Sequence, residues 1–203
     1  MNVQQPNALL VELFLVNGRV RGLTYEVHDR RRLVEVLTDP GHAFRLESVS
    51  VQLGADSAGR DFAMLNVEKR SILAAIPHET PQQLRERSLL RTTVGKSVTR
   101  QVQATLLLPP LIVEGSIHVP QSAGDIGGRL TADPQIFGRF VSVTGAMLTL
   151  PGGAEVEAPV LLVNRDLIAG ISVPEERRAV GSSPLVAAPD MRADAAAGRQ
   201  EGD

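Results

Sequence analysis

The stretch VELFLVNGRVRG, Val11–Gly22, decides the fold of this chain. An apolar extended segment runs into Asn17-Gly18, and a second extended segment returns directly. Asn-Gly favours a two-residue hairpin because both residues can adopt a positive φ. The returning segment passes through Gly22, and a glycine within a strand is typical of a sharp bend around a small barrel. The stretch therefore predicts the first two strands of a small β-barrel.

A second copy of this pattern follows, which indicates an internal duplication. The first copy opens at Val16–Leu23 and closes at Leu73–Glu79, and the second opens at Ile112–Ile117 and closes at Ala169–Glu176. Landmarks between these ends keep the same order in both copies. They pair Leu37–Pro40 with Leu130–Pro134, Phe44 with Phe140, and Val67–Ile72 with Val163–Ile168.

Each copy is expected to contain five short strands and a short polar or helical piece, Arg30–Thr38 or Ser122–Thr131. Five short strands close only a small barrel, whose interior side chains fill, so no ligand cavity is expected. The fold class is therefore predicted as all-β, mainly β with short helices, in two tandem five-stranded barrels. The later strands are expected at 44–53, 61–68 and 71–76 in the first copy, and at 139–150, 155–164 and 167–173 in the second.

The domain organisation follows from the repeat and from the composition between and after the copies. Thr80-Pro81-Gln82-Gln83 is a capping box with proline at the first helical position, which predicts a helix over about 81–91. The last segment is rich in Ala, Gly, Ser, Pro, Asp and Arg, a composition too poor in large apolar residues to order. We predict a first β-barrel repeat at 8–78, a helical linker at 79–98, a second repeat at 99–176 and a disordered tail at 177–203.

Composition excludes several classes of function. The 203 residues are 43% hydrophobic but only 3% aromatic, so the core is aliphatic and stacking platforms for bases are not expected. The net charge of −2 predicts no general affinity for polyanions. The absence of cysteine excludes disulfides, thiolate zinc sites, iron–sulfur clusters and cysteine nucleophiles. The beginning of the chain lacks a basic segment before an apolar one, and the expected location is cytoplasmic.

The same hairpin supports a family resemblance. Val11–Gly22 resembles the first signature of Sm-like proteins, most closely the bacterial Sm-like RNA chaperones, and Val67–Pro77 is similar to the second signature. The resemblance implies barrels of the Sm/SH3-like type. It also implies RNA contacts at Asp29, after the second strand, and at the short basic turn Lys69-Arg70. The tandem copies further resemble uncharacterised bacterial small-barrel domains that end in a Val-Asn-Arg-x-x-Ile turn, as Val163–Ile168 does.

No catalytic, cofactor-binding or metal-binding residues are predicted. The four histidines are scattered without the spacing of a metal site. Asp39 and Asp133 are explained by their Asp-Pro turns, whereas acid–base catalysis needs two carboxyl groups in one pocket. Gly95-Lys96-Ser97 resembles the end of a phosphate-binding loop, but Leu90 stands where that loop needs a glycine.

Basic residues supply the remaining candidates for binding. Arg30-Arg31-Arg32 and the segment from Arg85 to Arg100 could pair with phosphate groups, or could form solvated helix faces. The candidate nucleic-acid or partner contacts are Asp29, Arg30, Arg31, Arg32, Lys69, Arg70, Asn164 and Arg165.

Three hypotheses for the function result. The leading one is a non-catalytic binding or scaffold module that acts through protein–protein contacts or self-association, because exposed strands pair edge to edge. The second is an Sm-like RNA-binding protein, and the third is a phosphate-handling enzyme. A protein partner or a homo-oligomer is expected, RNA is the alternative partner, and neither a membrane nor a cofactor is expected.

Overall fold

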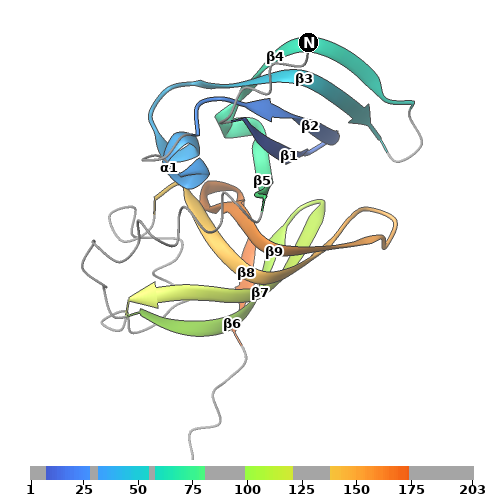
Figure 1. Ribbon diagram of the computed structural model, residues 1–203. Helices are drawn as coiled ribbons and strands as arrows, with labels where there is room; N and C mark the ends of the chain where they lie inside the picture. Colours follow the sequence, from blue (N-terminus) through green and yellow to red (C-terminus); the bar gives the residue numbers. More distant parts are fainter. Residues whose placement is uncertain (1–7, 28–31, 55–57, 81–98, 121–137, 174–203) are drawn as a thin grey trace, which may run out of the picture.

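The computed structural model describes residues 8–27, 32–54, 58–80, 99–120 and 138–173 (Figure 1). These residues form a single antiparallel sheet of ten strands with one short helix and two 3₁₀ turns. The all-β prediction is confirmed. The predicted linker helix at 81–91, the predicted piece at Ser122–Thr131 and the predicted tail lie outside the described residues.

The strands of the first half lie close to the predicted positions. They are β1 (Leu9–Leu15), β2 (Gly18–Thr24), β3 (Ala43–Leu53), β4 (Arg60–Glu68) and β5 (Ile72–His78). The helix α1 (Leu33–Thr38) connects β2 to β3, and the 3₁₀ turn η1 (Lys69–Ser71) connects β4 to β5. Leu33, Val36 and Leu37 bury one face of α1 in the core.

The second half repeats this succession of strands. They are β6 (Thr99–Leu108), β7 (Leu111–Pro120), β8 (Phe140–Thr149), β9 (Glu155–Asn164) and β10 (Gly170–Ser172), and the 3₁₀ turn η3 (Arg165–Leu167) lies between β9 and β10. Figure 1 shows the two halves one above the other, with β5 descending from the first toward the second.

The first hairpin forms as predicted, but its turn lies one residue earlier. Leu15 pairs with Gly18, so Val16 and Asn17 occupy the turn. Neither Asn17 nor Gly18 has a positive φ, so that part of the prediction is wrong. Gly18 is required by space instead, because a Cβ atom there would collide with the carbonyl oxygen of Gln52 on β3.

The two glycines within strands lie where the sheet is irregular. The register between β2 and β3 shifts across Gly22, and the register between β7 and β8 shifts across Gly115. A Cβ atom at Gly115 would lie 2.6 Å from the side chain of Val143 on β8. The glycine therefore allows the third strand of the half to approach closely at this point.

The strand order is β10-β6-β7-β8-β9-β5-β1-β2-β3-β4. Each half contributes its strands in the same relative order: last, first, second, third, fourth. The sheet is open, with β4 at one end and β10 at the other, so the prediction of two closed barrels is not confirmed. A closed barrel would need β4 to pair with β5, but the open side of β5 pairs with β9 of the other half.

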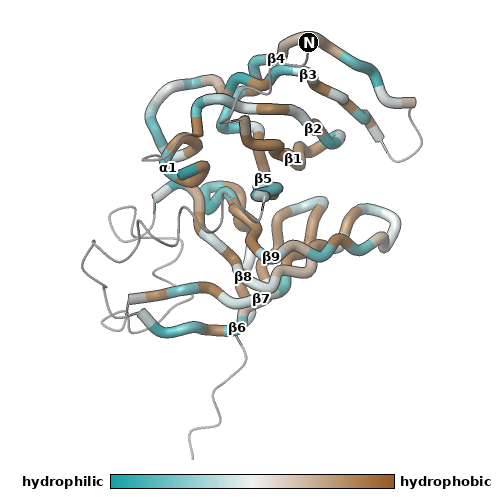
Figure 2. Tube along the Cα trace, in the orientation of Figure 1, coloured by the Kyte–Doolittle hydropathy of each residue, from teal (hydrophilic) through white to brown (hydrophobic). Residues whose placement is uncertain are grey.

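The core is divided into two clusters that exchange residues across the junction between β5 and β9. The first cluster includes Phe140 and Leu162 from the second half. The second cluster includes Phe14, Leu73 and Ile76 from the first half. Figure 2 shows the hydrophobic colouring of β1, next to this junction. Each half thus completes the packing of its neighbour.

Among the described residues, no helix has both the length and the apolar character needed to cross a membrane.

Candidate functional site

β4 (Arg60–Glu68) is the strand of the first half with the largest share of exposed residues. We call this strand, with its side away from β3, the β4 edge. β4 pairs only with β3 among the described strands. Phe62 and Met64, which project on the same side of the strand, expose 43% and 49% of their surface.

The middle of the β4 edge lacks the devices that usually protect an open strand, because its charged residues, Arg60, Asp61 and Glu68, lie at its two ends. Natural edge strands carry charges, proline or bulges that prevent pairing with another chain. The segment Phe62–Val67 contains neither a charged residue nor a proline, and its pairing with β3 shows no register shift. An apolar edge of this kind is a template for strand addition.

Lys69, a predicted RNA contact, is buried and stabilises the fold. Its side chain is buried, with 3% of the residue exposed. Its Nζ donates hydrogen bonds to the carbonyl oxygens of Val36, at 2.6 Å, and Asp39, at 3.2 Å. The last carbonyl groups of a helix lack partners within the helix, and a cation there interacts favourably with them. The ammonium group therefore caps the end of α1.

Arg70, the neighbouring predicted contact, lies at the surface and forms an ion pair. Its Nε donates to Glu68 Oε2 at 2.8 Å and its Nη2 to Glu68 Oε1 at 3.2 Å. This hydrogen bonding, with the charge of Arg70, holds the pKa of Glu68 below its usual value. The same hydrogen bonding raises the pKa of Arg70. Solvent screens such an exposed pair, so it contributes little to stability.

Asn164, predicted as a contact, is buried at the junction of the halves. Its Nδ2 donates to the carbonyl oxygen of Ile72, at 2.9 Å, and its Oδ1 accepts from the backbone N–H of Asp166, at 3.2 Å. Ile72 directly follows η1, and Asn164 directly precedes η3. The side chain therefore joins the equivalent turns of the two halves.

The other predicted contacts do not form a single surface with these residues. Arg165 is largely buried, with its Nη2 3.7 Å from an oxygen of Asp166. Arg32 stands before α1, and its Nε donates to Glu35 Oε1 at 2.8 Å. Asp29, Arg30 and Arg31 lie outside the described residues.

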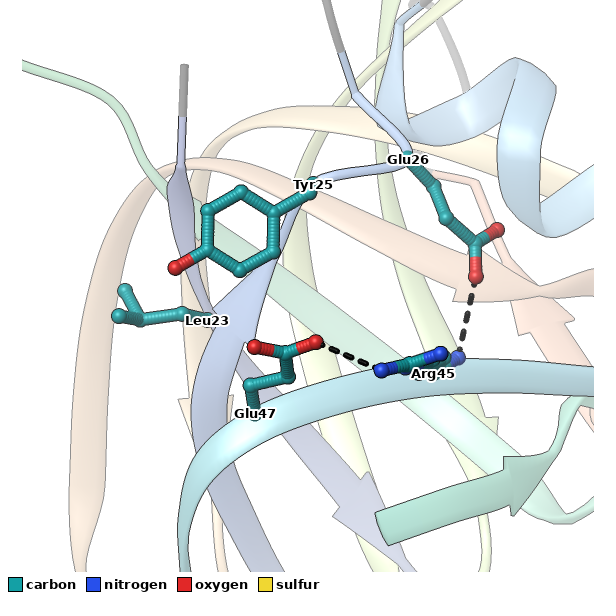
Figure 3. A pocket seen from close by; sticks show the side chains of 5 residues that line it. All are labelled: Leu23, Tyr25, Glu26, Arg45 and Glu47. Carbon is teal, nitrogen blue, oxygen red and sulfur yellow. Dashed lines mark hydrogen bonds and ion pairs between the residues drawn. The ribbon is translucent and has the colours of Figure 1, made fainter. Parts of the chain in front are cut away.

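A small pocket lies on the outer face of β2 and β3 (Figure 3). It has a volume of about 410 Å³ and is lined by Leu23, Tyr25, Glu26, Arg45 and Glu47. Nη2 of Arg45 donates to Glu47 Oε1 at 2.9 Å, and the backbone N–H of Arg45 donates to Glu26 Oε1 at 3.2 Å. Both carboxylates are thus engaged by the same arginine.

Metal-binding chemistry has no basis in the part of the chain that the structure describes. No group of three or more histidine, aspartate or glutamate side chains there could hold an ion.

The chain was compared with known proteins on three levels. Protein-family models, curated proteins and solved structures each gave no match. The resemblance to Sm-like proteins therefore remains a sequence-based hypothesis.

Sequence reasoning located β4 but did not identify Phe62 and Met64 as candidate contact residues. Their strand is at the edge because of the order of strands in the sheet, which alternation of residue types does not reveal. The sequence did carry one signal, the absence of charge from Phe62–Val67. Uncharged segments of this kind occur in central strands and in edge strands that lack protection.

Proposed function

We propose that this protein is a non-catalytic binding or scaffold module, made of two copies of a small β-barrel-like unit, that acts through protein–protein contacts or self-association. The duplication is supported by the identical strand order of the two halves. It is also supported by the equivalent turns η1 and η3, each of which follows the fourth strand of its half.

The observation that carries the proposal is the exposure of Phe62 and Met64 on an edge strand. Covering these side chains removes apolar surface from water, and pairing along the strand adds backbone hydrogen bonds. The pocket on β2 and β3 supports no competing enzymatic proposal, since Arg45 engages both of its carboxylates. Lys69 and Arg70 give RNA binding little support, because both have partners within the chain, and Asp29, Arg30 and Arg31 lie outside the described residues.

The experiment compares the tagged chain with its Met64→Lys variant after expression and affinity purification. Light scattering gives the mass of the assembly, and mass spectrometry identifies stoichiometric partners. We expect the wild type to carry a partner, either itself or another protein, and Met64→Lys to lose it. Glu157→Lys, at an exposed position of β9, is the control and should retain the partner. A wild-type chain that is strictly monomeric and partner-free would refute the proposal.

A further inference from the structure

The junction between the two halves is asymmetric. The fourth strand of the second half, β9, pairs with the last strand of the first half, β5. A contact between two different surfaces leaves the complementary surface of each unit free. Among the described strands, the fourth strand of the first half, β4, and the last strand of the second half, β10, each have a neighbour on one side only. The two ends of the sheet, β4 and β10, are thus equivalent to the two strands that pair inside the chain, β9 and β5.

The 3₁₀ turns establish which residues correspond. The N–H of Lys69 donates to the carbonyl of His42, and the N–H of Arg165 donates to the carbonyl of Arg139, so these pairs occupy equivalent places. Counting along the strands from these turns gives the equivalents of the four junction residues. Val67 corresponds to Val163, Asn66 to Leu162, Gly170 to Ala74, and Ile171 to Ala75.

We propose that a second copy of this chain binds end to end, with β10 of one molecule paired antiparallel to β4 of the next. The register repeats the internal junction. Ala74 lies opposite Val163 and Ala75 opposite Leu162 within the chain, so Gly170 lies opposite Val67 and Ile171 opposite Asn66 between chains. This inference rests on the proposed function and names its partner.

Exposed apolar side chains at the free end of the second half support this occupant. Phe14 is 2% exposed because the second half covers it. In the pairing of the first strand with the last, its counterpart is Leu107, which lies opposite Gly170. Leu107 is 45% exposed, and it pairs across the strands with Ile112, which is also exposed. The residue equivalent to the buried Phe14 is therefore also apolar at the β10 end of the sheet, but it is exposed there.

The β4 edge corresponds to the surface of β9 that contacts the first half, but it is less apolar. Met64 stands where the internal junction has Val160, which packs against the first core cluster. Asn66, however, stands where the junction has the buried Leu162. A polar residue at this place reduces the apolar area covered, so the contact between chains is expected to be reversible and concentration-dependent. Since the two surfaces differ, repetition produces a ring if the rotation closes and a filament if it does not.

Blocking one end at a time tests the asymmetry. Leu107→Lys blocks the β10 end, and Met64→Lys blocks the β4 edge. By light scattering, we expect each variant alone to be monomeric, whereas a 1:1 mixture should form dimers, since each variant retains the surface that the other lacks. Circular dichroism spectra like that of the wild type establish that both variants are folded. A mixture that remains monomeric, or variants that still assemble alone, would overturn the inference.

The register is tested with cysteine pairs, since the chain has no cysteine of its own. Asn66→Cys with Ile171→Cys should form disulfide-linked oligomers on oxidation. Asn66→Cys with Ser172→Cys, whose second cysteine points to the opposite face of the sheet, should form at least tenfold fewer. Ala75→Cys with Leu162→Cys calibrates the same geometry within one chain. Equal cross-linking of the first two pairs would refute the register.

The outcome also separates this inference from the proposed function. If purified wild-type protein stays monomeric and the Asn66→Cys, Ile171→Cys variant does not cross-link, while Met64→Lys loses a different co-purifying protein, self-assembly is refuted and the binding module stands. If no partner of either kind is found, both are refuted.

Discussion

Lys69 provides a direct test of whether the buried ammonium group at the end of α1 stabilises the fold. The Lys69→Met variant removes the ammonium group and keeps most of the aliphatic stem, so hydrophobic packing changes little. Two carbonyl oxygens, of Val36 and Asp39, lose their donor at the end of α1. Because the site is buried, water replaces that donor only in part.

The expected cost follows from these contacts. A hydrogen bond to a charged group contributes about 1.5–3 kcal/mol, so two such bonds contribute about 3–6 kcal/mol. The longer bond to Asp39 places the expected loss near the lower value, about 3 kcal/mol. Natural domains have free energies of unfolding of about 5–15 kcal/mol, so this is a large fraction. For a chain of this length it lowers the melting temperature by roughly 10 °C.

Urea unfolding followed by circular dichroism measures the loss, and hydrogen exchange should show faster opening of α1. Arg70→Met is the matched control, since it removes an adjacent basic residue that is exposed and paired only with Glu68 in the contacts described above; its unfolding midpoint should equal that of the wild type. If Lys69→Met unfolds at the same urea concentration as Arg70→Met, the cap on α1 has no energetic role and the reasoning is refuted.

Three further outcomes are expected. Asn164→Ala should lower the free energy of unfolding by about 2 kcal/mol, because a buried carbonyl loses its donor; Asn66→Ala, the same change at an exposed position, should have no effect, and equal urea midpoints would contradict this. Gly115→Ala should cost about 2 kcal/mol through overpacking against a neighbouring valine, and a calorimetric melting temperature unchanged from the wild type would show that the sheet adjusts freely. Arg70→Met should raise the pKa of Glu68 toward its ordinary value, because the hydrogen bond that lowers it is lost; an unchanged carboxyl titration by NMR would disprove that cause.

The strands could be predicted from the sequence because their signals are local. Alternation of apolar residues placed 44–53 and 155–164 within one residue of β3 and β9. The glycines at 22 and 115 marked the places where the register shifts. The turn of the first hairpin was misplaced because the requirement for Gly18 comes from Gln52 on β3, a residue distant in sequence.

Closure of the sheet could not be predicted because it depends on a choice between similar partners. The open side of β5 pairs with β9 and not with β4, although both are the fourth strands of their halves. Phe140 and Leu162 favour β9, since they enter the core of the first half. The counterpart of Leu162 on β4 is Asn66, which is polar, and this difference can be recognised only once the register is known.

The candidate contact residues were harder to predict than the strands. A charged residue is expected at the surface, but whether it is buried depends on the fold. Lys69 stands in a chain whose other basic residues are arginines except for Lys96. Its compact ammonium group fits between two carbonyl oxygens at the end of a helix. The choice of lysine at this position was therefore a signal of a confined site.

The exchange of core residues across the β5–β9 junction has a consequence for how the molecule comes apart. Separating the halves would bring Phe14 and Phe140 into water together, so neither half can melt while the other keeps its packing intact. Heat or urea should therefore produce one transition, with equal calorimetric and van't Hoff enthalpies. A gene truncated after the first half would yield a polypeptide that aggregates or is degraded.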